Sequence, residues 1–340
     1  MSDVAILFGG NGTETLVSCA SAQHFSERLP KAPCFYWTPD GKVCEIPRDE
    51  LHGHQNVFLN EFKPQKILSK WDSVAAFLDT FDKSNVLLLS LHGGDGENGW
   101  IQGHCEERKI FFTSSGSRAS QTALDKTTSK EIVRPRGVFL AKQVTFTAGQ
   151  AGKLAELRSL RKECASLVIK PTNEGSSTNL SFLHSETDLD QWWAKHEGSK
   201  ISWLAEEFLK GRELTIGVMT HKGCLMALPP SEVILERNAN FDYQGKYLGV
   251  GNQEITPADL SPKLTALAQE TVLLAHCAIG CYGYSRSEVI LTDRGPYYLE
   301  TNTLPGFTKK SFIPQQLAAA GISVDDFIAG QIHLARSRYL

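Results

Sequence analysis

The sequence predicts an α/β protein whose first 115 or so residues form a doubly wound unit built on a parallel sheet. Short apolar runs alternate there with helix-like patterns, which is typical of such chains. Glycine-rich loops follow two of the runs, at strand ends where open α/β sheets bind ligands. Farther along, a predicted β-hairpin brings acidic residues together and indicates a functional site outside this first unit.

The first elements are a strand at Val4–Phe8, a glycine loop that ends at Glu14, and a helix at Leu16–Leu29. This arrangement can cradle a ligand, because N–H groups at the helix start point into the loop. Thr15 stands where a dinucleotide-binding fingerprint needs its third glycine, so a nicotinamide oxidoreductase is not expected. Glu14 is either a partner of the helix dipole or a carboxylate that receives a substrate ammonium group.

A second glycine-rich loop, residues 91–99, follows a predicted buried strand at Val86–Ser90. His92 in this loop is either structural or a contact for a substrate carboxylate. The other elements expected in this unit are a strand and turn at Phe35–Glu45, helices at Trp71–Phe81 and Trp100–Arg108, and a strand at Ile110–Thr113.

The middle of the chain carries a loop of small and hydroxyl residues, 172–179, between two predicted strands. Such loops can wrap backbone N–H groups around phosphates. It is not a Walker loop, because Lys170 precedes the glycine and no helix follows. The elements expected around it are a helix at Ser117–Val133, ended by Pro135 and Gly137, strands at Leu167–Pro171 and Leu180–His184, and a helix through His196 capped by Ser185 and Asp188.

The C-terminal part contains a long irregular stretch, residues 229–259, of a length typical of lids, binding loops or disordered segments. Lys246 and Tyr247 near its middle favour a lid. The regular elements expected here are strands at Ile201–Phe208 and Arg212–Met219, an amphipathic helix at Pro262–Ile279 stopped by Gly280, and a closing helix at Asp325–Arg336.

The hairpin is predicted where Tyr284–Leu291 and Pro296–Thr301 flank Asp293-Arg294-Gly295. A three-residue loop pairs Glu288 with Glu300 and Arg286 with Asn302, and all four then share one face. Opposed carboxylates repel each other and weaken a sheet, unless a hard cation lies between them. Two carboxylates and an amide oxygen suit Mg²⁺ held with waters and phosphates. The alternative is an exposed face with scattered charges.

Composition excludes several classes of protein. Among 340 residues, 35 basic and 38 acidic side chains give a net charge of −3 without a basic stretch, so nucleic acid is not an expected partner. No apolar run is long enough to cross a membrane. The N-terminus lacks a basic region typical of signal peptides, and none of the eight cysteines forms a CxxC pair. We therefore expect a cytoplasmic protein with reduced thiols.

Seven segments, in order, resemble the D-alanine–D-alanine ligases of the ATP-grasp superfamily along essentially the whole chain. They are LFGGNGTETLVS, LHGGDGENGWIQG, ALDK, IKPTNEGSS, EEFLKGRE, FDYQGKY and YLETNTLPGFTKKS. The resemblance implies a pre-ATP-grasp α/β domain at 1–115, which binds substrate, and a two-part α+β ATP-grasp fold. The two parts are expected at 116–205 and 206–340, with the lid at 229–259 and ATP between them.

The resemblance also implies a role for each matching residue. Lys126, Lys170 and Lys246 match phosphate-contacting lysines, and Ser176 and Ser177 match the loop that closes over the phosphates. Glu206, Glu207, Phe208 and Leu209 match the adenine-binding hinge, and Glu213 matches the acid that binds the ribose. Glu288, Glu300 and Asn302 match ligands of two Mg²⁺ ions, where Mn²⁺ can substitute.

Glu14, linked to Ser176 and Tyr247, matches the acid for the first substrate's ammonium group, and His92 matches the residue near its carboxylate. Arg286 and the Gly306 N–H match the oxyanion site, and Ser311 and Phe312 match contacts to the second substrate's carboxylate.

The implied activity joins two D-alanines through an acyl phosphate, with ATP consumed, for peptidoglycan precursors; a homodimer is expected. Alternatives are a ligase making another dipeptide or D-alanyl-D-lactate, and a non-catalytic ATP-binding homologue. The chain departs from the family pattern at Glu288, where Asp is usual, and at Leu16, Asn98 and Asn179. These departures concern turnover and first-substrate preference.

Overall fold

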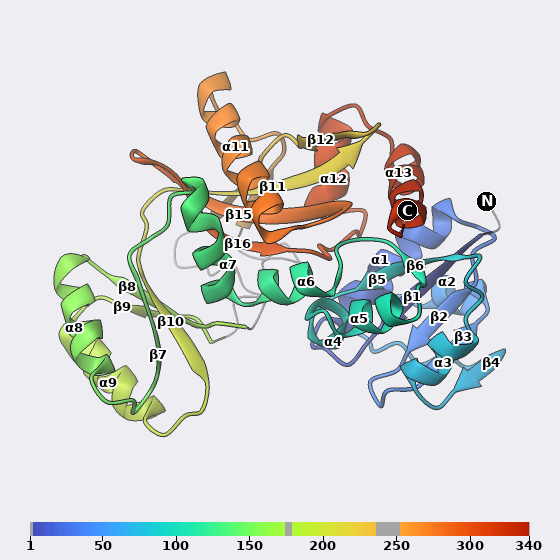
Figure 1. Cartoon of the computed structure of the whole chain (residues 1–340), viewed down its shortest axis with the longest axis horizontal. Coiled ribbons are helices and arrows are strands. Elements are labelled where there is room, and N and C mark those ends of the chain that lie inside the picture. The colour runs from blue at the N-terminus through green and yellow to red at the C-terminus, as the bar shows by residue number, and fades with distance from the viewer. Residues whose placement is uncertain (1–2, 174–178, 236–251, 340) are drawn as a thin grey trace.

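The computed structural model describes residues 3–173, 179–235 and 252–339. Within these residues the strands form three sheets that lie side by side along the molecule (Figure 1). None of the described helices has the length and apolar character needed to cross a bilayer.

The N-terminal sheet has the strand order β4-β3-β2-β1-β5-β6. Its centre is parallel, as expected, because β1 pairs in parallel with β2 and β5, and β5 with β6. Its far edge is antiparallel, with β3 paired to β2 on one side and to β4 on the other. The reason is the short turn at Asp40-Gly41, which folds the chain back on itself. The strands are β1 (Val4–Gly9), β2 (Cys34–Trp37), β3 (Val43–Ile46), β4 (Ser69–Trp71), β5 (Val86–Leu91) and β6 (Phe111–Phe112).

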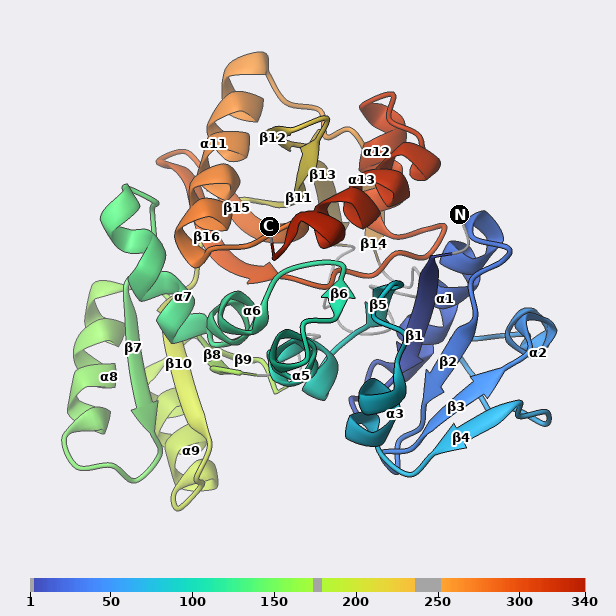
Figure 2. The same cartoon turned by 45° about the vertical axis from the view of Figure 1, so that its right-hand side comes forward.

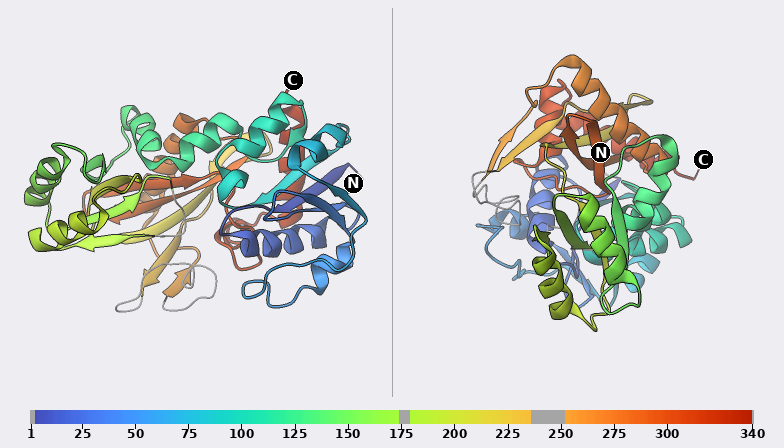
Figure 3. Two further views of the ribbon diagram at one scale, coloured as in Figure 1. Left: turned by 90° about the horizontal axis from the view of Figure 1, so that it is seen from below. Right: turned by 90° about the vertical axis from the view of Figure 1, so that its left-hand side faces the viewer.

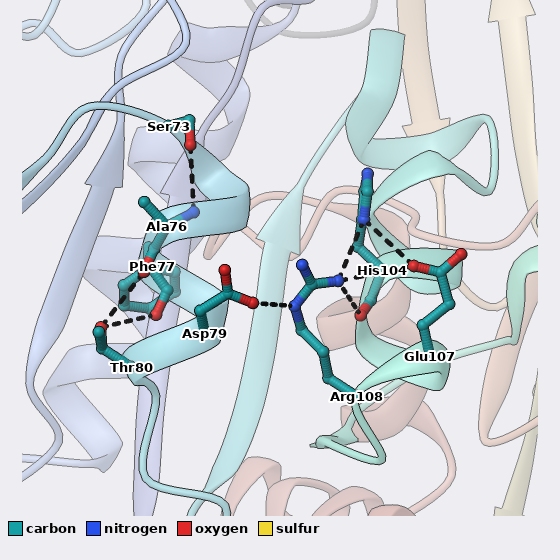
Figure 4. Close-up of polar contacts among 8 residues, drawn as sticks. All are labelled: Ser73, Ala76, Phe77, Asp79, Thr80, His104, Glu107 and Arg108. Atoms are coloured by element: carbon teal, nitrogen blue, oxygen red, sulfur yellow. Dashed lines mark hydrogen bonds and ion pairs between the residues drawn. The ribbon is translucent and has the colours of Figure 1, made fainter.

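Five helices flank the described part of this sheet: α1 (Thr15–Arg28), α2 (Arg48–Gly53), α3 (Val74–Thr80), α4 (Gly94–Glu97) and α5 (Trp100–Glu107). The helix expected at 71–81 begins only at α3, because the Ser73 side chain accepts a hydrogen bond from Ala76 N and caps it. Figure 4 shows this cap and the ion pair between Asp79 and Arg108, with 2.8 Å between Oδ1 and Nε, which connects α3 to the end of α5.

The middle sheet is antiparallel, in the order β7-β10-β8-β9. Two helices cover one face of this sheet (Figure 3). Trp192, Trp193 and Trp203 belong to the hydrophobic core between the helices and the sheet. The opposite face carries Lys170 and Glu206, and β10 continues past the boundary expected at residue 205. The elements are β7 (Gln143–Thr147), α8 (Lys153–Glu163), β8 (Leu167–Pro171), β9 (Ser181–Leu183), α9 (Glu186–His196) and β10 (Ser202–Glu207).

The C-terminal sheet has the order β14-β13-β11-β15-β16, with β12 paired to β11. The ends of the stretch expected to be irregular, 229–259, are strands β13 and β14, which pair with each other; residues 236–251 lie outside the described residues. The strands are β11 (Arg212–His221), β12 (Cys224–Ala227), β13 (Ser231–Leu235), β14 (Asn252–Ile255), β15 (Tyr284–Thr292) and β16 (Gly295–Asn302).

Helices α6 (Ser117–Leu124), α7 (Lys126–Val133) and α11 (Pro262–Ile279) pack against this sheet, and a short 3-10 turn, η1 (Arg134–Arg136), follows α7. The single helix expected at 117–133 was wrong. Asp125 has the extended angles φ −81° and ψ 105°, and its side chain accepts a hydrogen bond from Thr128 N at 2.7 Å. Asp125 therefore starts a new helix, with Lys126 in its first turn.

The last two helices are α12 (Phe312–Ala319), which packs on β11, and α13 (Val324–Ser337), which returns to the N-terminal unit. Helix α13 packs on β5 and β6 (Figure 2). Phe307 stacks between Phe25 of α1, at 4.5 Å between ring centroids, and Phe327 of α13, at 4.9 Å. C-terminal side chains thus fill part of the N-terminal core.

The Ser185 cap of α9 yields a stability prediction. Ser185 accepts from Asp188 N while the Asp188 side chain accepts from Ser185 N. Ser185→Ala removes one half of this box, and we expect the free energy of unfolding to fall by about 1 kcal/mol. Denaturant titration measures it, with the exposed Thr187→Ala as control. Equal effects of the two substitutions would contradict a capping role.

Candidate active site

The β15–β16 hairpin brings the predicted residues together. Glu288 pairs with Glu300 and Arg286 with Asn302, as expected. The expected three-residue loop was wrong: Thr292 pairs with Gly295, which leaves a two-residue turn. A register shift after Glu288 adds one residue to β16 and restores the pairing at the far end. The turn and the bulge offset each other, so the four side chains still share one face.

Strand β11 extends this face on the other side of β15. Thr215 pairs with Glu288, and Gly217 pairs with Arg286. Glu213, two residues before Thr215, therefore projects from the same face. The predicted ribose-binding acid and the predicted metal ligands thus lie on one surface of the sheet.

Cationic groups accompany both carboxylates. Lys126 Nζ lies 3.3 Å from Glu300 Oε2, and Arg286 Nη2 lies 3.3 Å from Glu288 Oε1. Arg286 Nε is buried and has no hydrogen-bond partner within the described part of the chain. Buried donors are normally satisfied, so this atom indicates a place where a further acceptor binds.

A buried ion network connects the middle sheet to this hairpin. Glu206 accepts from Lys130 Nζ at 2.6 Å through Oε1 and lies 2.7 Å from Lys170 Nζ through Oε2. Lys130 Nζ also donates to the carbonyl of Tyr298 on β16 at 3.3 Å. The Lys130 side chain is fully buried and the Glu206 side chain is 4% exposed. The network fixes the Lys170 ammonium at the sheet face that is turned toward β16.

The pKa values of this network follow from its charges. Burial alone would raise the pKa of Glu206, but Lys130 and Lys170 outweigh it and lower the pKa to about 2. Burial alone would lower the pKa of Lys170, but Glu206, Glu300 and Glu288 outweigh it and raise the pKa. Both groups are therefore charged at neutral pH, and Lys170 is available as a cation.

The two glycine loops of the N-terminal unit approach the same place. Glu14 occupies the N-cap position of α1 but makes no side-chain cap. A Cβ on Gly93 would lie 3.1 Å from Glu14 Oε2, so the backbone of the second loop passes close to this carboxylate. Glu97 is buried and accepts from Gly93 N at 3.1 Å; burial and the charge of Glu14 raise its pKa to about 7. The nearby charge of Arg286 opposes that rise.

His92 is buried and both of its ring nitrogens contact protein groups. Nδ1 lies 2.7 Å from the carbonyl oxygen of Leu304, and Nε2 lies 3.0 Å from Ser21 Oγ. The expected contact with a substrate carboxylate remains a prediction. Through its contact with Leu304, His92 holds the segment between β16 and α12 in place.

The segment after β16 places the remaining expected residues. Asn302 Oδ1 accepts from Leu304 N at 2.8 Å, which orients its amide and leaves one lone pair on that oxygen. Ser311 is the N-cap residue of α12, and its Oγ accepts from Thr308 N at 2.9 Å. The Arg286 guanidinium lies 5.8 Å from the Phe312 ring centroid. The oxyanion candidates and the second-substrate candidates are therefore neighbours.

The hinge residues differ in their exposure. Glu207 pairs with Arg294 at 2.9 Å, Phe208 is 44% exposed and Leu209 is buried. The Glu206 carboxylate is already engaged by two lysines, so its role toward adenine remains a prediction. Ser176, Ser177, Lys246 and Tyr247 lie outside the described residues.

Three residues that the sequence did not single out belong to this site: Ser21, Glu97 and Lys130. Lys130 follows Lys126 by four residues on one helix, a spacing that places both on the same face. Glu97 had only its position in the second glycine loop as a signal. Ser21 carried no signal in the sequence, because its partner His92 is 71 residues away.

Solved structures with this architecture cover nearly all of the chain. D-alanyl-alanine synthetase A from Vibrio cholerae superposes with a TM-score of 0.79 at 21% identity, covering 99% of each chain. VanG D-Ala:D-Ser ligase from Enterococcus faecalis gives a TM-score of 0.78 at 24% identity, covering 98% of each. The fold is a pre-ATP-grasp α/β domain followed by an ATP-grasp fold, the class that the three sheets define.

The family follows from sequence matches. The family model for the D-ala D-ala ligase N-terminus matches residues 3–115, and that for the C-terminus matches residues 137–333. D-alanine–D-alanine ligase from Rhodospirillum rubrum is 37% identical, covering 98% of both chains. The enzyme of the same name from Leptospira interrogans is 32% identical over the full length of both. This chain belongs to the D-alanine–D-alanine ligase family and is an enzyme of that class.

The Glu206 network predicts a pH dependence of stability. A carboxyl whose folded pKa lies at about 2, below its ordinary 4.5, stabilises the protein above pH 4.5 and loses that effect as pH falls toward 2. We expect the free energy of unfolding of Glu206→Gln to fall less between pH 6 and about 3.5 than that of the unchanged protein. Urea titration at several pH values measures this, and parallel curves would contradict the ionised network.

Proposed function

We propose that this chain is an ATP-dependent ligase that joins two D-alanines into D-alanyl-D-alanine through an acyl phosphate, for peptidoglycan precursors. One observation carries the proposal. The face that holds Arg286, Glu288, Glu300 and Asn302 meets Lys126 and, through Glu206, Lys170. Cations and hard-oxygen ligands thus converge where two sheets adjoin, as phosphoryl transfer to a carboxylate requires.

The donor set of this face fits magnesium. No three His, Cys, Asp or Glu side chains in the described ranges cluster as a metal site, so the set consists of two carboxylates and the Asn302 amide oxygen. Glu288 and Glu300 stand directly opposite each other, an arrangement that a divalent cation stabilises. These three residues would hold two Mg²⁺ ions, or Mn²⁺, which when bound neutralise charge on the phosphates of ATP.

Cationic side chains and one backbone N–H contact the phosphates and the acyl oxygen in this proposal. Lys126 and Lys170 contact phosphate oxygens, with Lys170 held charged by the carboxylates around it. Arg286 and the Gly306 N–H stabilise charge that develops on the acyl oxygen when the second amine attacks. The unpaired, buried Arg286 Nε supports this role within the described residues. Loss of one such donor typically slows a reaction by about 10²–10³.

Substrates are assigned by charge and position. Glu14 receives the ammonium group of the first D-alanine, and Ser311 and Phe312 contact the carboxylate of the second. The hinge from Glu206 to Leu209 and the Glu213 carboxylate bind adenine and ribose. Ser176, Ser177, Lys246 and Tyr247 complete the phosphate loop and the lid, which excludes water from the acyl phosphate. We further propose a homodimer in the cytoplasm.

A product assay tests the activity. The protein is incubated with Mg-ATP and pairs drawn from D-alanine, D-serine, D-lactate and L-alanine, while phosphate release and product mass are followed. We expect ADP, phosphate and a product with the mass of the alanine dipeptide, formed from D-alanine alone. Release with D-lactate but not D-alanine as acceptor would replace this proposal with an ester-forming ligase. Absence of release with every pair would favour the non-catalytic homologue.

The metal-binding face yields a mutational prediction. Glu300→Gln keeps the size of the side chain but removes one of the opposed charges, and we expect turnover to fall by about 10²-fold or more while the fold persists. Steady-state kinetics and far-UV circular dichroism measure the two effects. Asp293→Asn, the same chemical change at the exposed tip of this hairpin, is the control and should keep its activity. Near-normal turnover of the Gln variant would contradict the metal assignment.

A further inference from the structure

Side chains of the N-terminal unit hold the backbone of the segment from Thr303 to Phe307. His92 Nδ1 donates to the Leu304 carbonyl at 2.7 Å, and Phe307 N donates to Ser21 Oγ at 3.0 Å. His24 Nδ1 lies 3.0 Å from the Phe307 carbonyl, and Ser114 Oγ donates to the Thr303 carbonyl. The segment between these contacts carries Gly306, the proposed backbone donor of the oxyanion site.

Ser21 and His92 are themselves joined, with 3.0 Å between Oγ and Nε2. The partners determine where the protons lie. A carbonyl oxygen only accepts, so His92 Nδ1 carries a proton, and burial lowers the pKa of the ring, which keeps it neutral. Nε2 then accepts a hydrogen bond from the Ser21 hydroxyl, whose oxygen in turn accepts from Phe307 N. The hydrogen bonds therefore all run the same way: Phe307 N donates to Ser21, Ser21 donates to His92, and His92 donates to the Leu304 carbonyl.

We propose that Ser21 and His92 are positioning residues of the ligase reaction, which together fix both ends of the Leu304–Phe307 segment and so the place of the Gly306 N–H. The inference rests on the proposed function, because the oxyanion role of Gly306 does. Neither residue touches the reacting atoms in this role. In this role His92 acts through both ring nitrogens, which contact Ser21 Oγ and the Leu304 carbonyl.

The segment needs such support from outside. Pro305 has no N–H to bond with, and Gly306 has no side chain to pack, so its neighbours determine where its N–H points. Ser21 is fully buried and His92 is 6% exposed. Each anchoring bond is therefore shielded from water, and removing the hydroxyl leaves the Phe307 N–H and the His92 nitrogen without partners.

Helix α1 offers a matched control. Ser26 is also fully buried, and its Oγ also lies near an imidazole nitrogen, 2.9 Å from His52 Nε2. Its hydroxyl donates to Gln23 O, within the same helix. Ser26→Ala therefore removes a comparable serine–histidine contact that does not involve the Leu304–Phe307 segment.

The kinetic experiment compares Ser21→Ala with Ser26→Ala. We expect Ser21→Ala to lower kcat by about 10–100-fold, because a misplaced donor costs rate even when substrate still binds. The KM for ATP should stay unchanged, and His92→Gln combined with Ser21→Ala should lose little more than the worse single variant. Ser26→Ala should keep kcat at the level of the unchanged protein. Equal kcat for both serine variants, or additive losses in the double variant, would overturn the proposal.

A second measurement does not depend on activity. Nitrogen-15 shifts of the histidine rings, assigned to His92 by comparison with His92→Gln, should show Nδ1 protonated and Nε2 bare, and Ser21→Ala should move the Nε2 signal. A protonated Nε2 in the unchanged protein would overturn the hydrogen-bond directions. If the protein made no product with any substrate pair, the proposed function would fail, while these shifts would still test the hydrogen-bond chain.

Discussion

The opposition of Glu288 and Glu300 across two paired strands is the constraint around which the other charges are arranged. Like charges at that distance destabilise a sheet, so the fold must supply cations. It supplies Lys126 from the start of α7 and Arg286 from the same strand as Glu288. The break at Asp125 between α6 and α7 serves this arrangement. Because α7 starts there, Lys126 lies in its first turn and its ammonium group reaches Glu300 of the hairpin.

The buried ion network extends this arrangement to the middle sheet. Glu206 on β10 holds Lys170 on β8, while Lys130 on α7 holds Glu206 and the backbone of β16. Removing one partner of such a buried set leaves an uncompensated charge, which is costly. The two halves of the proposed nucleotide site are therefore joined by the same charges that keep Lys170 ionised.

Local patterns predicted most elements, and the errors lie where a single side chain or turn decides. Ser73 and Asp125 moved helix starts by capping. The hairpin register was right at Glu288 although the turn was wrong, since a bulge restored it. Spacing could have drawn attention to Lys130, but Ser21 and His92 meet only through tertiary structure. The likeness of seven segments to a known family supplied roles that periodicity alone does not contain.

Phe307 and Phe327 complete a core that otherwise belongs largely to the first sheet: Phe307 stacks on Phe25, and Phe327 stacks on Phe307. During synthesis on the ribosome, the first hundred residues emerge long before these rings do. Until then, the nascent N-terminal unit has part of its apolar core surface uncovered. Final closure of that core awaits the end of translation, which makes the N-terminal module a late-maturing part of the protein despite its early appearance.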